Sequence, residues 1–98
     1  MPSTHEQERS IERVVRIRNP EGLHMRPCMQ FCEKANQFAS KVTLAKESQV
    51  VDGKSIMQVS MLAATQGTEL RLRAVGVDAA EAVEALARVI ERKSPDEE

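Results

Sequence analysis

The chain has 98 residues, of which 41% are hydrophobic and 30% charged, and its formal net charge at pH 7 is −1. This length predicts one small domain with a single modest core. The near-zero charge gives no electrostatic footprint of nucleic acid or of an anionic membrane. No apolar run approaches the ~20 residues that span a bilayer. Two cysteines are too few for a disulfide framework, and they favour free thiols in a reducing cytoplasm, the expected location.

The first third of the chain predicts an arm, a strand, a turn and a helix. Residues 1–10 are polar with no apolar period and are expected to form a flexible arm. Residues 11–18 alternate apolar and charged side chains, which predicts a half-buried strand. Residues 19–22 have turn chemistry. From Arg26 to about Gln37, apolar side chains recur with helical spacing, with Pro27 in the first turn.

The middle of the chain predicts three strands and a second helix. Residues 41–46 and 49–52 are two short strands joined by a tight polar turn. Ser55 is expected to start a helix of about ten residues, ended by Gly67 after a short turn. Residues 68–75 alternate leucine or alanine with charged side chains and form the fourth predicted strand.

The last predicted element is a helix that Asp78 opens, with Glu81 three residues later in an approximate capping box. The resulting order, β-α-β-β-α-β-α, with strands that each have one apolar face, predicts an α+β two-layer sandwich. We expect one domain over residues 11–93 and an acidic tail over residues 94–98.

His24 and Arg26 are the first candidate site, because they flank the predicted start of a helix. A helix start combines unpaired backbone N–H groups with the positive end of the helix dipole, which favours bound phosphate. A neutral imidazole is a nucleophile toward phosphorus, and a guanidinium binds phosphate oxygens in a fork. On this pattern alone, a histidine in a helix-capping turn is the commoner explanation.

Ser55 is the second candidate, as a phosphorylation site at a helix start, although helix capping alone also explains a serine there. The helix that follows carries one more apolar stripe than a one-sided sheet requires. One stripe consists of Ile56, Val59 and Ala63, and the other of Met57, Met61 and Ala64, with Ser60 between them. Either the surplus forms an exposed docking patch, or neighbouring segments cover it.

Two further groups of residues are better explained by structure than by a metal site or a nucleic-acid surface. His24, Cys28 and Cys32 are spaced four apart, but three ligands without a fourth nearby give a weak metal signal, so we predict core thiols and no metal. Arginines on the open sheet face would be the footprint of nucleic acid, but acidic neighbours dilute them and aromatic side chains are scarce. We therefore predict a solvated face; the arginines are Arg16, Arg18, Arg71 and Arg73. No cofactor is predicted.

Three segments together resemble one family. Residues 22–27, Gly-Leu-His-Met-Arg-Pro, closely resemble the active-site signature of the histidine-containing phosphocarrier protein HPr of the bacterial phosphotransferase system. Residues 53–57 resemble the regulatory-serine region of that family, and residues 65–68 match the turn before its last strand. The resemblance implies an open-faced β-sandwich, with an antiparallel sheet of order 1-4-2-3 covered on one face by three helices.

The resemblance also implies roles and partners. His24 would take a phosphoryl group on Nδ1 from enzyme I and pass it to enzyme IIA-type domains, with Arg26 stabilising the phosphate. Ser55 would be the serine modified by HPr kinase/phosphorylase. The protein would be a monomeric carrier rather than a stand-alone enzyme; the alternative is a regulatory protein of carbon or nitrogen control switched at Ser55. Partner-docking positions would be Met25, Pro27, Met57, Ser60 and Met61, with Met25 and Cys28 standing where small alanines are usual.

Overall fold

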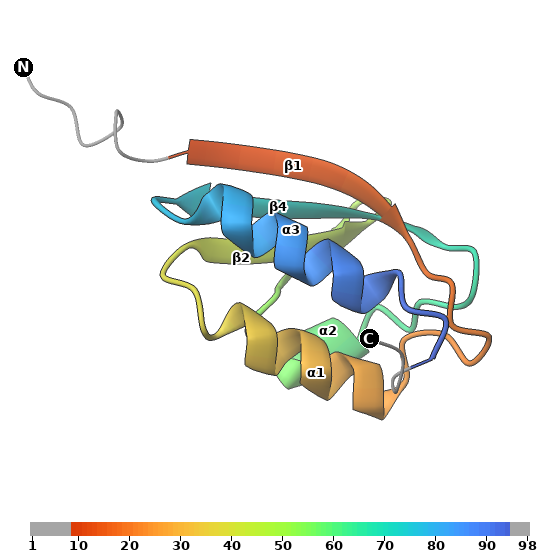
Figure 1. Cartoon of the computed structure of the whole chain (residues 1–98). Coiled ribbons are helices and arrows are strands. Elements are labelled where there is room, and N and C mark those ends of the chain that lie inside the picture. Colours follow the sequence, from red (N-terminus) through yellow and green to blue (C-terminus); the bar gives the residue numbers. More distant parts are fainter. Residues whose placement is uncertain (1–8, 95–98) are drawn as a thin grey trace, which may run out of the picture.

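The computed structural model describes residues 9–94 and contains seven elements in the predicted order (Figure 1). They are β1 (Arg9–Arg16), α1 (Met25–Ala35), β2 (Lys41–Lys46), β3 (Gln49–Asp52), α2 (Ile56–Ser60), β4 (Glu69–Gly76) and α3 (Ala79–Ile90). No helix within the described range is long and apolar enough to cross a membrane.

The four strands form one antiparallel sheet in the order β1-β4-β2-β3. The last strand of the chain, β4, therefore lies in the middle, between β1 and β2. Figure 1 shows the helices layered below the sheet, with α3 under β1 and β4 and α1 beside α2. This arrangement confirms the open-faced sandwich and the strand order implied by the resemblance.

Alternation along the strands builds the core, as the sequence predicts. In β4, Leu70, Leu72 and Ala74 are fully buried against the helices, while Glu69, Arg71 and Arg73 face outward. The helices contribute buried side chains of their own, and among these are both cysteines of α1. The buried helical residues include Cys28, Phe31, Cys32, Ala35, Val83, Leu86 and Ile90. Both thiols are free, which confirms the prediction of core cysteines.

The first strand is displaced by two residues from its predicted bounds of 11–18. It begins at Arg9, because Arg9 pairs with Gly76 at the end of β4, and it ends at Arg16, which pairs with Glu69. The partner strand, rather than the local alternation, sets both ends. Arg9 and Ser10 thus belong to the sheet, not to the predicted arm. Residues 1–8 of that arm and residues 95–98 of the predicted tail lie outside the described residues.

The second helix starts at Ser55 as predicted but has five residues instead of about ten. Bonds from Leu62 N–H to the Val59 carbonyl (3.1 Å) and from Ala63 N–H to the Ser60 carbonyl (3.2 Å) tighten its end. The chain then turns at Ala63, whose φ is +47°. This turn places Leu62, which is 1% exposed, in the core. The helix therefore ends before the apolar period does.

Asp78 precedes α3 but does not form the predicted capping box, since its carboxylate makes no bond to that helix. Its oxygens instead accept hydrogen bonds from the backbone N–H groups of Ala39 and Ser40, both at 2.9 Å, and from the Ser40 hydroxyl. These bonds, the one from the Ser40 side chain foremost, lower the pKa of Asp78. The residue thus ties the loop after α1 to the start of α3.

Candidate functional site

The turn before α1 is fixed by local hydrogen bonds and by a close approach to a distant loop. The Asn19 side chain accepts from Glu21 N–H (3.0 Å), and its carbonyl accepts from Gly22 N–H (2.9 Å). Leu23 N–H then donates to the Ala64 carbonyl over 2.8 Å. Gly22 has φ +73°, and a Cβ there would lie 2.6 Å from the Ala64 oxygen. Only glycine fits at this position. The close contact with Ala64 therefore sets the position of the residues that follow Gly22.

His24 is the N-cap residue of α1. Its carbonyl accepts the first bond of the helix, from Cys28 N–H at 3.1 Å, while its side chain makes no capping bond. The amide N–H groups of the first helical turn have no carbonyl partner within the helix, and they mark the positive end of its dipole. The imidazole therefore stands where an anion is favoured, and the helix-capping explanation does not account for its side chain.

The imidazole is held with its two nitrogens in different surroundings. The Nε2 atom is buried and lies 3.3 Å from the Glu21 carboxylate, although no described residue makes an aligned hydrogen bond with it. The side chain as a whole is 36% exposed. Because Nε2 is covered, the exposed surface of this side chain belongs to its other atoms.

A hollow of about 310 Å³ opens beside the imidazole. Two cations line it: Arg26, from the first turn of α1, and Lys93, from the segment after α3. Glu21 is the one anionic side chain among its lining residues, which are Asn19, Pro20, Glu21, His24, Arg26, Lys93 and Ser94. The structure thus brings the predicted pair, His24 and Arg26, to one hollow large enough for a phosphoryl group.

Sequence reasoning missed two of these lining residues. Glu21 lies three residues before His24, and this spacing across a glycine turn was a visible signal. Lys93 gives no local signal, because only the packing of α3 against α1 brings the end of α3 toward the turn.

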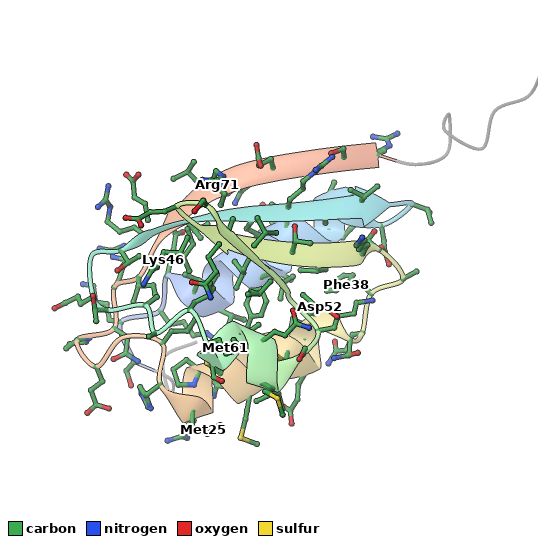
Figure 2. The ribbon with its side chains drawn as sticks, turned by 180° about the vertical axis from the view of Figure 1, so that it is seen from behind. Met25, Phe38, Lys46, Asp52, Met61 and Arg71 are labelled. Carbon is green, nitrogen blue, oxygen red and sulfur yellow. The ribbon has the colours of Figure 1, made fainter. Side chains whose placement is uncertain are left out.

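Ser55 and Met61 cap the two ends of α2, which contains Met57 and packs against α1. The Ser55 hydroxyl accepts from Gln58 N–H at 3.2 Å, as the predicted cap does. Of the surplus apolar stripe, Met57 and Met61 are exposed, whereas Ala64 is buried. Figure 2 shows Met25 of α1 and Met61, the C-cap residue of α2, in the same part of the molecule. We define the methionine patch as the exposed side chains of Met25 (57%), Met29 (42%), Ile56 (39%), Met57 (76%) and Met61 (62%).

Of the other predicted docking residues, Ser60 is exposed, and its hydroxyl donates to the Met57 carbonyl at 2.8 Å. Pro27 differs, because it is buried. It lines a small cleft together with Leu23, Val89 and Ile90, near the end of α3.

The arginines of the open sheet face take part in contacts within the protein. Arg16 pairs with Glu69, Arg71 donates to the Glu47 carbonyl (3.0 Å), and Arg73 donates to the Ser10 hydroxyl (3.0 Å). The hollow of about 550 Å³ on this face is lined by both signs of charge, namely Lys46 and Arg71 with Glu47 and Glu69. Arg18 lies beyond the end of β1. This mixed surface agrees with a solvated face.

The fold and the helix-start histidine define a class of small phosphoryl-accepting domains, and comparison with known proteins identifies the family. The family described as "PTS HPr component phosphorylation site" matches residues 11–92. The chain belongs to the HPr family.

Three curated relatives show the range of this family. The phosphocarrier protein HPr of Neisseria meningitidis serogroup A is 42% identical over 80 residues, which cover 82% of this chain and 90% of that protein. The HPr-like protein Crh of Bacillus subtilis is 40% identical over 83 residues, covering 85% and 98%. The multiphosphoryl transfer protein of Haemophilus influenzae is 40% identical over 90 residues, 89% of this chain, but the chain spans only 18% of its length.

Solved structures of the family agree with the fold. HPr from Bacillus anthracis superposes with a TM-score of 0.81 at 33% identity, covering 84% of this chain and 98% of that one. An HPr from Thermoanaerobacter tengcongensis superposes with a TM-score of 0.83 at 39% identity, covering 90% and 98%.

Proposed function

We propose that this protein is a phosphocarrier that accepts a phosphoryl group on Nδ1 of His24 from phospho-enzyme I and passes it to an enzyme IIA-type domain in the cytoplasm. The observation that carries the proposal is the placement of His24 as the N-cap of α1, with Nε2 buried while the side chain as a whole is 36% exposed. Membership of the HPr family supports it.

The transfer needs no group beyond those at the hollow. The Nδ1 lone pair attacks phosphorus, a P–N bond forms, and the bond between phosphorus and the donor's own carrier atom breaks. The N–H groups of the helix start stabilise the phosphoryl oxygens, and the Arg26 guanidinium binds them in a fork. A second in-line attack by the acceptor reverses these steps and frees His24.

Labelling with radioactive phosphoenolpyruvate and enzyme I tests this proposal. We expect an acid-labile, base-stable phosphate on the wild-type protein and none on His24→Ala. Full labelling of His24→Ala would refute the assignment. Arg26→Lys keeps the charge but loses the fork, so we expect slower transfer with the label still at His24.

We further propose that the methionine patch and Ser60 form the surface on which enzyme I and enzyme IIA domains dock. Met25 follows His24 directly, so any protein that reaches the imidazole also meets the patch. Methionine adapts its shape to different partners, as a carrier between two proteins requires. Met57→Lys and Met61→Lys should therefore raise KM for the carrier in both transfers. Val50→Lys is the matched control, because Val50 is 60% exposed but lies on β3, outside the patch. Equal effects of all three would contradict the proposal.

A regulatory function switched at Ser55 is the second candidate. Similarity to the HPr-like protein Crh supports it, as does the position of the half-buried Ser55 hydroxyl at the start of α2 beside the patch. A phosphate there would place two negative charges next to the docking surface and change which partners bind. An HPr kinase/phosphorylase should label the wild type and not Ser55→Ala; labelling of Ser55 without any labelling of His24 by enzyme I would favour this function over the carrier.

A further inference from the structure

The turn that presents His24 also presents a carboxylate to the back of its ring. The Glu21 Oε1 atom lies 3.3 Å from Nε2 of His24, three residues later in the chain. The Asn19 side chain fixes the backbone of Glu21 by accepting its N–H at 3.0 Å. This buried nitrogen makes no aligned hydrogen bond with a described residue, and Glu21 supplies the one carboxylate contact that it has among them. The carboxylate is thus the polar group available to the non-reacting side of the imidazole.

A carboxylate at this place has a defined chemical effect. A neutral imidazole carries one proton, on either Nδ1 or Nε2, and an ionised carboxylate only accepts hydrogen bonds. Contact with Glu21 therefore favours the tautomer with the proton on Nε2, in which Nδ1 keeps its lone pair. When Nδ1 attacks phosphorus, the ring becomes a cation that retains the Nε2 proton, and the adjacent carboxylate stabilises that cation.

The other charges at the hollow act in the opposite direction. Arg26 from α1 and Lys93 from the segment after α3 are both cationic, and they disfavour a positive imidazole. The remaining lining residues, Asn19, Pro20 and Ser94, carry no side-chain charge. Glu21 is therefore the one anion among the lining residues that offsets the ring charge.

We propose that Glu21 is a positioning residue, which fixes the Nε2–H tautomer of His24 and stabilises the phosphorylated ring in its protonated form. The inference rests on the proposed carrier function for its second half, whereas the tautomer of the free ring is independent of that function. The inference assigns a role to a carboxylate, whereas the groups proposed to bind the phosphate are a guanidinium and backbone N–H groups.

Two variants and one control separate this role from a structural one. Glu21→Ala removes the carboxylate, and Glu21→Gln keeps an acceptor without charge. Glu33→Gln removes an exposed carboxylate elsewhere on α1 and serves as the control. Long-range ¹H–¹⁵N spectra of the neutral ring in the unphosphorylated protein should show Nε2–H in the wild type and in Glu33→Gln. In Glu21→Ala the Nδ1–H form should rise by about two- to fivefold, as expected for loss of one exposed pair, with Glu21→Gln between them.

The second readout is the ³¹P resonance of the phosphorylated protein as a function of pH. In Glu21→Ala the ring should bind its proton about two- to fivefold more weakly than in the wild type, since the neighbouring anion is gone. An unchanged tautomer ratio in Glu21→Ala would overturn the inference even if His24 is labelled normally. If enzyme I labels nothing, the carrier function fails, and the tautomer spectra still decide the role of Glu21.

Discussion

Replacing Gly22 with alanine tests how closely the turn before α1 packs against the backbone of Ala64 and Thr65. Gly22 has φ +73°, and an alanine Cβ would lie 2.6 Å from the Ala64 oxygen and 3.0 Å from Thr65 Cα. The left-handed conformation costs an L-residue roughly 1–2 kcal/mol. The backbone atoms in the way cannot rotate aside, and such overpacking adds about 1–3 kcal/mol. We therefore expect Gly22→Ala to lower the free energy of unfolding by about 2–5 kcal/mol, measured by urea denaturation.

Gly67 provides a matched control for this substitution. Its φ is +88°, but a Cβ there meets no atom within 4 Å. Gly67→Ala should therefore cost only the conformational part, roughly 1–2 kcal/mol. Enzyme I should also phosphorylate Gly22→Ala more slowly than Gly67→Ala, because only the former shifts His24. If the two variants lose the same stability and keep the same rate, the turn is not held against Ala64 as described.

Three smaller perturbations probe other parts of the fold. Hydrogen bonds, led by that from Ser40, lower the pKa of Asp78 in the folded protein. The carboxylate therefore stabilises the fold above the pKa that Asp78 has in the unfolded chain, and this stabilisation is lost as the pH falls through the lower folded pKa. Asp78→Asn should flatten the decline of stability below about pH 4, and an unchanged acid-denaturation curve would contradict this. Burial raises the pKa of Cys32 to about 11, so we expect Ellman's reagent to react slowly with the native protein at pH 8 and fast in urea, whereas rapid native reaction would be incompatible with a core thiol. Ser55→Ala removes the bond to Gln58 N–H and should cost about 1 kcal/mol in thermal or urea unfolding; a loss near zero would show that the cap does not stabilise α2.

The sequence predicted the parts of the fold that local periodicity controls. Alternation in residues 68–75 placed Leu70, Leu72 and Ala74 on the buried face, as observed. The length of α2 could not be predicted in this way. Residues 61–64 continue the apolar period, but the chain turns at Ala63, and a left-handed alanine is not foreseeable from local propensity.

The same distinction between local pattern and tertiary packing applies to the residues of the candidate site. His24 and Arg26 belong to a short motif with a physical rationale, so the sequence identified them. Pro27 belongs to the same motif, but its burial depends on how α3 packs, and the prediction of a docking role did not anticipate that. Lys93 enters the hollow through tertiary packing alone, which no spacing in the sequence reveals.

The position of β4 in the centre of the sheet has a consequence for synthesis on the ribosome. Within the described sheet, β1 pairs with β4 alone, and the His24 turn is held by the Ala64 carbonyl. Until these later residues leave the ribosome, the nascent chain has no partner for its first strand and no carbonyl to hold the turn before His24. Long-range pairing of this kind is also slow to form. The first strand and the His24 turn are therefore completed only after residues 64–76 have left the ribosome.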